Sequence, residues 1–186
     1  MTRNVKRFLA ASLLSLTPSI ALAGQAEFGF PDLLTQRDEY VSLRGEGVQV
    51  PTRRGPPVAS IGPALENLFV FNQTGLNISL GLQVVTGTFN GVFTPYPVPT
   101  ATLGGFQVSA PAPAPLIAQQ YYWTVDPANP AGAKTCVWRV EVSDVAGVCS
   151  AQVFSGTYGG AVCTVDAVQS FIDPNTCQTQ IVTNIL

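Results

Sequence analysis

The sequence predicts an all-β protein, a two-layer antiparallel β-sandwich of short strands with little helix. Gly and Pro are frequent, with 17 Gly and 15 Pro among 186 residues, which suits short strands joined by turns. Apolar and polar residues alternate along residues 76–83, as they do in a half-buried strand. All four cysteines lie in the last third of the chain, so we expect a disulfide-stapled C-terminal half.

Residues 1–23 have the three-part pattern of a secretory signal peptide. Basic residues precede an apolar stretch at 8–16, and Ala21 and Ala23 form a small-x-small cleavage site. The apolar stretch is shorter than the roughly 20 residues that a membrane span needs. The sequence therefore predicts export to the periplasm, cell surface or extracellular space, with no transmembrane span after cleavage. Loss of Arg3, Lys6 and Arg7 would change the net charge from −2 to −5.

Residues 24–62 form a charged N-terminal segment, and residues 63–186 are expected to form the sandwich domain. Within the segment, residues 31–40 could begin a short helix because Pro31 is tolerated in a first turn. Residues 48–50 predict a short strand, and residues 53–57 predict an exposed loop. Whether this segment packs on the domain stays open at this point.

Residues 67–125 contain no Asp, Glu, Lys or Arg. Residues 68–71 predict a buried strand, residues 72–75 a turn, residues 76–83 the alternating strand, and residues 84–93 further strand broken by glycine. Alternate prolines at 95–99 exclude a central strand, because proline lacks the N–H that the ladder needs. The Pro-rich stretch at 110–115 predicts a stiff crossover between two sheets or a linker.

The last third predicts a series of strands separated by turns. Residues 121–125 are rich in strand-forming types, and each cysteine opens a further strand-like run, at 136–142, 149–154, 163–168 and 177–182. An even number of cysteines in an exported chain predicts two disulfides, Cys136, Cys149, Cys163 and Cys177 in one of three connectivities. In a flat meander alternate strands lie about 9.5 Å apart, beyond the roughly 7 Å Cα separation that a disulfide spans. Either the chain forms two layers or the bonds are local, and we favour two layers with the connectivity open.

The inventory of reactive groups argues against an enzyme. The chain has no His, which excludes Ser-His-Asp and Cys-His catalysis, and it has no phosphate-binding, dinucleotide or calcium-loop motif. The carboxylates in the strand-rich half are Asp126, Glu141, Asp144, Asp166 and Asp173. Turn roles account for Asp126, Asp144 and Asp173. We therefore expect no enzyme, no cofactor and no metal site.

Aromatic residues are the remaining candidates for a binding site. Tyr122, Trp123 and Tyr158 are the candidate binding residues, with Trp123 and Trp138 alternatively in the core. The negative net charge argues against a nucleic-acid partner. Because edge strands are commonly protected by charge, an uncharged stretch of this length predicts a surface covered by a protein partner or by self-assembly. The function predicted is non-enzymatic assembly, adhesion or protein–protein interaction, and the alternative is a carbohydrate-binding module.

Overall fold

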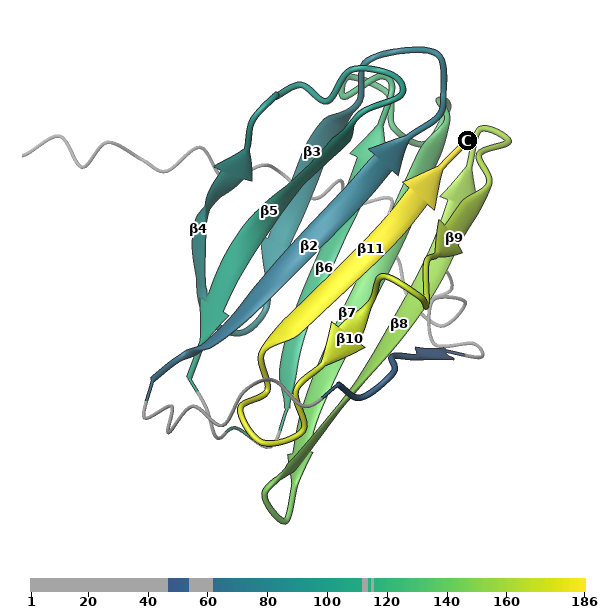
Figure 1. The fold of residues 1–186 in the computed structure, drawn as a ribbon. Helices are drawn as coiled ribbons and strands as arrows, with labels where there is room; N and C mark the ends of the chain where they lie inside the picture. Colours follow the sequence, from purple (N-terminus) through teal and green to yellow (C-terminus); the bar gives the residue numbers. More distant parts are fainter. Residues whose placement is uncertain (1–46, 54–61, 112–113, 115) are drawn as a thin grey trace, which may run out of the picture.

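The computed structural model describes residues 47–53, 62–111, 114 and 116–186. This part of the chain consists of strands and turns without a helix, arranged as two sheets packed face to face (Figure 1). The predicted fold class, an all-β two-layer sandwich, is therefore confirmed. The predicted signal peptide, the short helix and most of the charged N-terminal segment lie outside the described residues.

The first sheet, called sheet A, has five strands in the order β1-β8-β7-β6-β3, each antiparallel to its neighbours. Its strands are β1 (Val48–Gln49), β3 (Ser79–Val84), β6 (Ile117–Thr124), β7 (Thr135–Val145) and β8 (Val148–Tyr158). The predicted strand at 48–50 is present as β1. Val50 is buried, so residues 47–53 of the N-terminal segment pack on the sandwich.

The second sheet, called sheet B, has the order β10-β11-β2-β5-β4, with β9 also paired to β11. Its strands are β2 (Ala64–Asn72), β4 (Thr88–Phe93), β5 (Leu103–Ala110), β9 (Cys163–Val165), β10 (Phe171–Ile172) and β11 (Thr179–Ile185). The β2–β11 ladder is parallel, from Glu66 beside Thr179 to Asn72 beside Ile185. It departs from the antiparallel arrangement that every other strand pair follows within the described residues.

The core lies between the sheets, and strict alternation along β2 shows which of its residues face it. In β2 the side chains of Leu68 and Val70 are buried and those between them are half-buried, as expected for a strand with one face on the core. Phe106 of sheet B meets Tyr121 of sheet A edge to face, with ring centroids 5.0 Å apart. Tyr121 in turn stacks on Trp138 at 5.8 Å. This aromatic row joins the two layers.

Two disulfides join sheet A to sheet B. Cys136 of β7 bonds Cys163 of β9, and Cys149 of β8 bonds Cys177, which precedes β11. The Cα separations are 5.6 and 5.2 Å, within the range that a disulfide spans. The chain leaves sheet A after β8 and enters sheet B at β9, which brings the cysteines together as two layers allow and a flat meander does not.

Some predicted strands are shorter in the structure. The alternating stretch enters a strand at Ser79, and Leu76 lies outside it with 61% of its surface exposed. The run that begins at Cys163 stops at Val165 because Asp166 accepts hydrogen bonds from the backbone N–H groups of Val168 and Gln169. This Asx-type turn competes with the sheet for the backbone.

Candidate functional site

The stretch without charge forms one complete half of the sandwich. Residues 67–125 supply β3 and β6 of sheet A, β4 and β5 of sheet B, and most of β2. In Figure 1 these blue to green strands occupy the left-hand side, opposite the strands that carry the disulfides. Glu66 is the one charged residue of these five strands. We call these five strands, without Glu66, the uncharged half.

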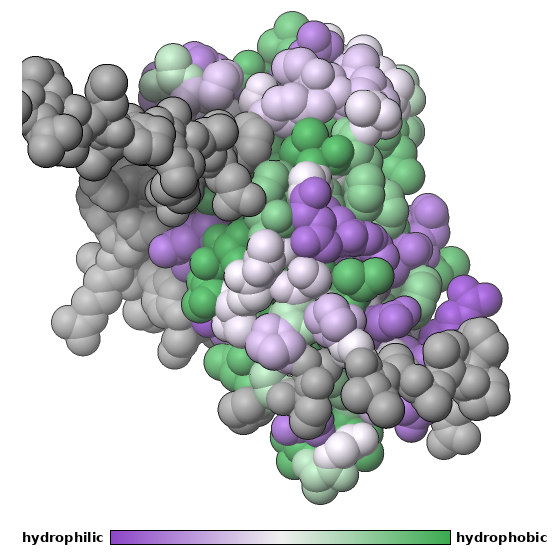
Figure 2. Space-filling view, turned by 90° about the vertical axis from the view of Figure 1, so that its left-hand side faces the viewer, coloured by the Kyte–Doolittle hydropathy of each residue, from purple (hydrophilic) through white to green (hydrophobic). Residues whose placement is uncertain are grey.

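Figure 2 shows the side of the molecule bounded by the edge strands β3 and β4. Apolar surface there is interrupted by a central hydrophilic band. Because residues 67–125 contain no Asp, Glu, Lys or Arg, polar contacts from the uncharged half are made by amides, hydroxyls and backbone groups. Such a surface offers no countercharge to nucleic acid or anionic lipid.

Both edge strands of the uncharged half are protected by geometry in place of charge. Ile78, just before β3, exchanges two backbone hydrogen bonds with Val98, at 3.0 and 2.9 Å. The backbone N–H of Leu80 donates to the Tyr96 hydroxyl at 3.3 Å. On the other edge, β4 carries a register shift between Phe89 and Gly91, and such bulges disfavour pairing with a further strand. The outer faces of the sheets are therefore more open to a partner than these edges.

The outer face of sheet B carries a row of amide side chains across three strands. Gln107 of β5 donates to the Asn67 side chain of β2 at 2.8 Å and accepts from Asn90 of β4 at 2.9 Å. The Ser109 hydroxyl donates to Asn90 at 3.1 Å. An amide offers two donors and two acceptor sites, so Gln107 keeps hydrogen-bonding capacity beyond these two bonds.

A pair of aromatic rings lies beside the amide row. Phe69 of β2 and Phe93 of β4 stack with centroids 5.1 Å apart, and Gly105 of β5 stands between them in the register. Both rings are half-buried. Leu103, which lies on β5 like Gly105, is 47% exposed. No local sequence pattern indicated this surface. The surface forms because three strands pair in sheet B, which brings Asn67, Asn90 and Gln107 together from distant parts of the chain.

The three predicted binding residues do not form one surface. Trp123 is completely buried between the sheets, as Trp138 is, so the core interpretation holds for both tryptophans. Tyr122 points to the outer face of sheet A, where it is 4% exposed and packs with Val137 and the partly buried Tyr158. Tyr122 and Tyr158 thus share a face, and Trp123 lies on the opposite side of the strand.

The carboxylates that were weighed for catalysis have structural roles. Oxygen atoms of Asp126, Asp144, Asp166 and Asp173 each accept backbone N–H groups two or three residues later, which defines Asx-type turns. At Asp166 these hydrogen bonds, led by the Gln169 backbone N–H, hold the pKa below its usual value. Glu141 forms an ion pair with Arg139.

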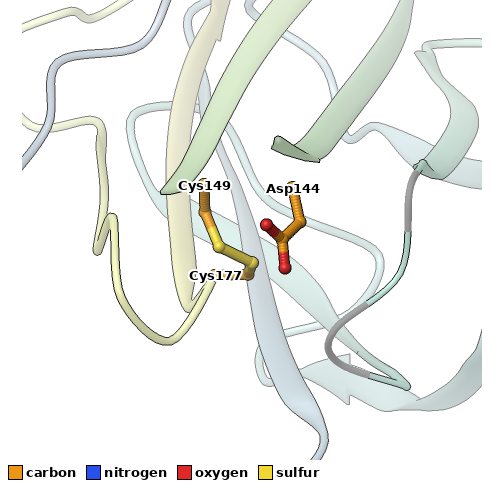
Figure 3. A group of neighbouring side chains, drawn as sticks. All are labelled: Asp144, Cys149 and Cys177. Carbon is orange, nitrogen blue, oxygen red and sulfur yellow. A yellow bond between two sulfur atoms is a disulfide. The ribbon is translucent and has the colours of Figure 1, made fainter. Parts of the chain in front are cut away.

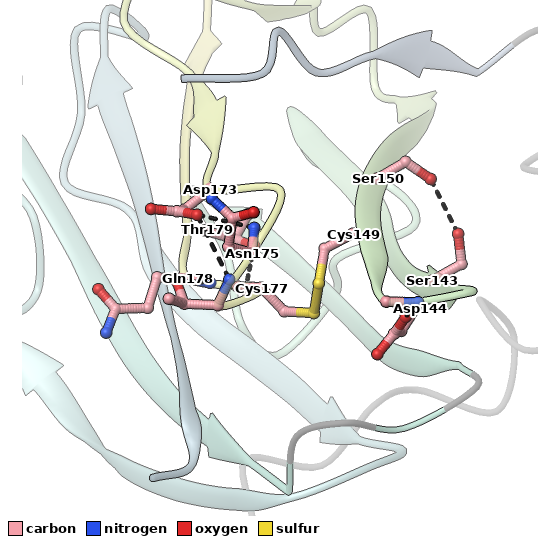
Figure 4. The surroundings of a disulfide bond; sticks show 11 residues. Ser143, Asp144, Cys149, Ser150, Asp173, Asn175, Cys177, Gln178 and Thr179 are labelled. Atoms are coloured by element: carbon pink, nitrogen blue, oxygen red, sulfur yellow. Dashed lines mark hydrogen bonds between the residues drawn. A yellow bond between two sulfur atoms is a disulfide. The ribbon is translucent and has the colours of Figure 1, made fainter. Parts of the chain in front are cut away.

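Asp144, Cys149 and Cys177 bring a carboxylate and two sulfur atoms within 4.8 Å of one another (Figure 3). The sulfurs are bonded to each other, so neither can supply the thiolate that a metal ligand requires. Hydrogen bonds and the disulfide stabilise the β7–β8 hairpin around this group (Figure 4). Asp144 accepts from the Gly147 N–H at 2.9 Å, and the Ser143 and Ser150 hydroxyls lie 2.9 Å apart across β7 and β8.

Glu66 is the charged residue that the sequence analysis overlooked. Its side chain is fully buried on the inner face of β2, opposite Gln119 and Tyr121 of β6. Neither carboxyl oxygen has a hydrogen-bond partner among the described residues, and the Tyr121 hydroxyl and the Gln119 oxygen also lack one. Burial raises the pKa of the Glu66 carboxyl from 4.5 to about 7, and the nearby Gln119 amide opposes part of that rise. Burial and the charge of Glu66 both raise the pKa of Tyr121.

The alternation of inward and outward side chains along the strand could have located the Glu66 carboxyl. Glu66 stands two residues before Leu68 and four before Val70, so a strand that buries those two residues also turns the carboxyl inward. A buried carboxyl with a strongly perturbed pKa is an unusual feature that is common at functional sites. It is therefore the second candidate feature of this molecule, beside the uncharged half.

No protein-family model, curated protein sequence or solved structure matches this chain. The fold and the disulfides thus define the class of protein: a two-layer β-sandwich whose sheets are cross-linked by two cystines. Two disulfides indicate an oxidising, non-cytoplasmic environment. In the described part of the chain we find no helix with the length and apolarity of a membrane span.

Proposed function

We propose that the chain is an exported, non-enzymatic β-sandwich protein that acts in assembly, adhesion or protein–protein interaction at the cell surface. The observation that carries the proposal is the uncharged half, in which the five strands from the stretch 67–125 lie on one side of the molecule. The predicted signal peptide supports export. The turn roles of the aspartates leave little acid–base chemistry for catalysis.

The outer face of sheet B is the part of the uncharged half that best suits a protein partner. It combines exposed Leu103 and the Phe69–Phe93 pair with amides that retain hydrogen-bonding capacity. Interfaces typically pair apolar and aromatic anchors with uncharged hydrogen-bonding groups and are depleted in charge at their centre. A partner that docks here need not desolvate an ion.

The test is the association state of the secreted protein, measured by size-exclusion chromatography with light scattering and by pull-down from cell-surface extracts. Leu103→Lys places a cation on the outer face of sheet B, and we expect it to weaken association at least about tenfold, which is ~1.4 kcal/mol. Val168→Lys is the matched control, because Val168 is 95% exposed and lies outside the uncharged half. A monomer at high concentration that also recovers no partner would contradict the proposal.

A carbohydrate-binding role is the second candidate, and the amide row beside Phe69 and Phe93 favours it. Neutral sugars are recognised by aromatic rings and by paired uncharged hydrogen-bonding groups, which this face presents together. A glycan array decides between the candidates. Binding to a neutral glycan that Phe93→Ala abolishes would favour this role, and Tyr158→Ala tests the surface on sheet A in the same way.

A further inference from the structure

The space around Glu66 contains polar groups that have no partners, and no cation faces Glu66, among the residues that the structure describes. From β6, Gln119 and Tyr121 face the carboxyl. The neighbouring strands β5 and β11 place Val108 and Thr179 beside Glu66 in the register. From β7, Trp138 stacks on Tyr121. Tyr121 is thus the one other titratable side chain facing Glu66 from the described strands packed around it, and Arg139 points out of the opposite face of β7 with Glu141.

The covalent cross-links of the sandwich all lie on the β11 side of Glu66, and the nearer one is at Cys177, two residues before the Thr179 that pairs with Glu66. Both disulfides join β7 or β8 to β9 or to the turn before β11. Glu66 faces β6, which is followed in sheet A by the edge strand β3. On the other side of Glu66 the layers are held without a disulfide, by packing, by the chain connections β2–β3, β3–β4 and β5–β6, and by the backbone hydrogen bonds between Ile78 and Val98. A change in interior packing is therefore less restrained on the β5 and β3 side of Glu66 than on its β11 side.

We propose that Glu66 is a pH-responsive element that loosens the packing between β2 and β6 when its carboxyl loses its proton, while the disulfide-bonded half stays closed. The inference goes beyond the proposed function and does not depend on any partner. A neutral carboxyl is tolerated between the sheets, whereas a buried carboxylate without a cation is not. The structure relieves the ionised group by admitting water along β6 and β3. The connection at residues 85–87 keeps the two edges together, so we expect loosening and not separation of the layers.

The two tryptophans report on this change directly, since the chain contains two and both are fully buried. In the oxidised protein we expect acrylamide quenching of their fluorescence to rise between about pH 5.5 and about pH 8.5, with a midpoint near neutrality. Glu66→Gln keeps the shape and removes the ionisation, so it should flatten the curve. Asp126→Asn, which removes a carboxyl in an external turn, should leave the curve unchanged.

Hydrogen exchange compared at the same pH for the two proteins locates the change. We expect faster exchange in β3 and β6 of the wild type than of Glu66→Gln above neutral pH, with no difference in β8 and β9. A wild-type protein that matches Glu66→Gln in quenching and in exchange at every pH would overturn the proposal. Uniform loosening of both halves would overturn it as well.

A third measurement covers the case in which Glu66→Gln fails to fold. Carbon-13 NMR of the Glu side chains in the wild type follows the Glu66 carboxyl itself through its titration. A carboxyl that stays protonated up to about neutral pH supports the proposal, and one that ionises in the ordinary range of about 4 to 5 refutes it. None of these readouts involves the association state, so failure here is distinct from failure of the proposed function.

Discussion

Two residues of the molecule are in locally unfavourable states, one through burial and one through backbone conformation. Glu66 is fully buried, and no cation from the described part of the chain pairs with it. Ala146 adopts a positive φ of 55° that alanine rarely visits. Each is locally unfavourable, and each persists because the surrounding strands fix the position. Each also gives a measurable effect on stability.

The pKa of Glu66 predicts that stability falls as the pH rises. The folded-state pKa of about 7 lies above the ordinary value of 4.5, so the unfolded chain loses the proton first. Stability is then fully present below about pH 4.5, declines between about pH 4.5 and 7, and is lowest above, with a total loss of about 3 kcal/mol. Urea unfolding at several pH values measures it. Glu66→Gln should remove this component of the pH dependence, and an identical slope in both proteins would contradict the assignment.

Replacement of Ala146 should stabilise the β7–β8 hairpin. Ala146 and Gly147 both have positive φ, 55° and 80°, as in the two-residue type I′ turn that favours Asn-Gly. We expect Ala146→Asn to stabilise the fold by about 0.5–1 kcal/mol, since asparagine tolerates this conformation better than alanine. The urea midpoint should rise at constant slope. Gly147→Ala should act in the opposite direction, and a shared sign for the two variants would refute the turn assignment.

At the scale of the element, β5 illustrates how backbone approach fixes a strand between two others. A Cβ atom at Gly105 would lie 2.5 Å from the Leu68 carbonyl oxygen, and one at Gly104 would lie 2.1 Å from a methyl group of Val98. Gly105 lets β2 lie close beside β5 within sheet B, and Gly104 lets the 94–99 segment come close to the inner face of β5. The aromatic pair Phe69 and Phe93 then covers the outer side of Gly105.

Gly105→Ala should therefore destabilise the sandwich, by about 1–3 kcal/mol, because the obstacle is backbone that cannot rotate away. Thermal or urea unfolding measures the change. Gly62→Ala is the matched control, since a Cβ there meets no atom within 4 Å and its φ is not positive. We expect that variant to be neutral or slightly stabilising. Equal effects of the two substitutions would show that the close approach is not limiting.

Much of the element pattern follows from the sequence, because alternation and turn residues act locally. The strands predicted at 68–71, 76–83 and 121–125 correspond to parts of β2, β3 and β6, and the Pro-rich loop at 95–99 is also visible in this way. The early end of the strand at Val165 and the exposure of Leu76 are not, since each depends on a side-chain hydrogen bond or on where a partner strand stops. The amide row required the pairing of β2, β5 and β4, which no local pattern specifies.

At the scale of the whole molecule, the two disulfides divide the sandwich into a cross-linked half and an uncharged half. They close loops of similar length, with sequence separations of 27 and 28. The cysteine count predicted two bonds, but the pairing depends on β9 crossing to sheet B, and that step is a property of the tertiary fold. The position of the charge-free stretch on one side also became visible only in three dimensions.

Removal of either disulfide should cost a similar amount of stability. A loop of this length corresponds to about 3–4 kcal/mol in the chain-entropy description. We expect the paired replacements Cys136→Ala with Cys163→Ala, and Cys149→Ala with Cys177→Ala, to lower the free energy of unfolding by comparable amounts in urea titrations. Wild-type protein unfolded with reductant should lose more than either variant. A negligible effect of one pair would contradict its role as a cross-link between the layers.

The parallel ladder between β2 and β11 has a consequence for the order in which the molecule is completed. Thr183 donates to the Phe69 carbonyl across 114 residues of chain, and Glu66 to Asn72 find their parallel neighbour only in β11. During synthesis or translocation the N-terminal part of the chain emerges first. One edge of β2 therefore stays exposed until the residues between β2 and β11 have also emerged. Contacts of such sequence separation form late and slowly, and unpaired strand margins attract foreign strands. The interval before β11 arrives is thus when this protein most needs shielding from its neighbours.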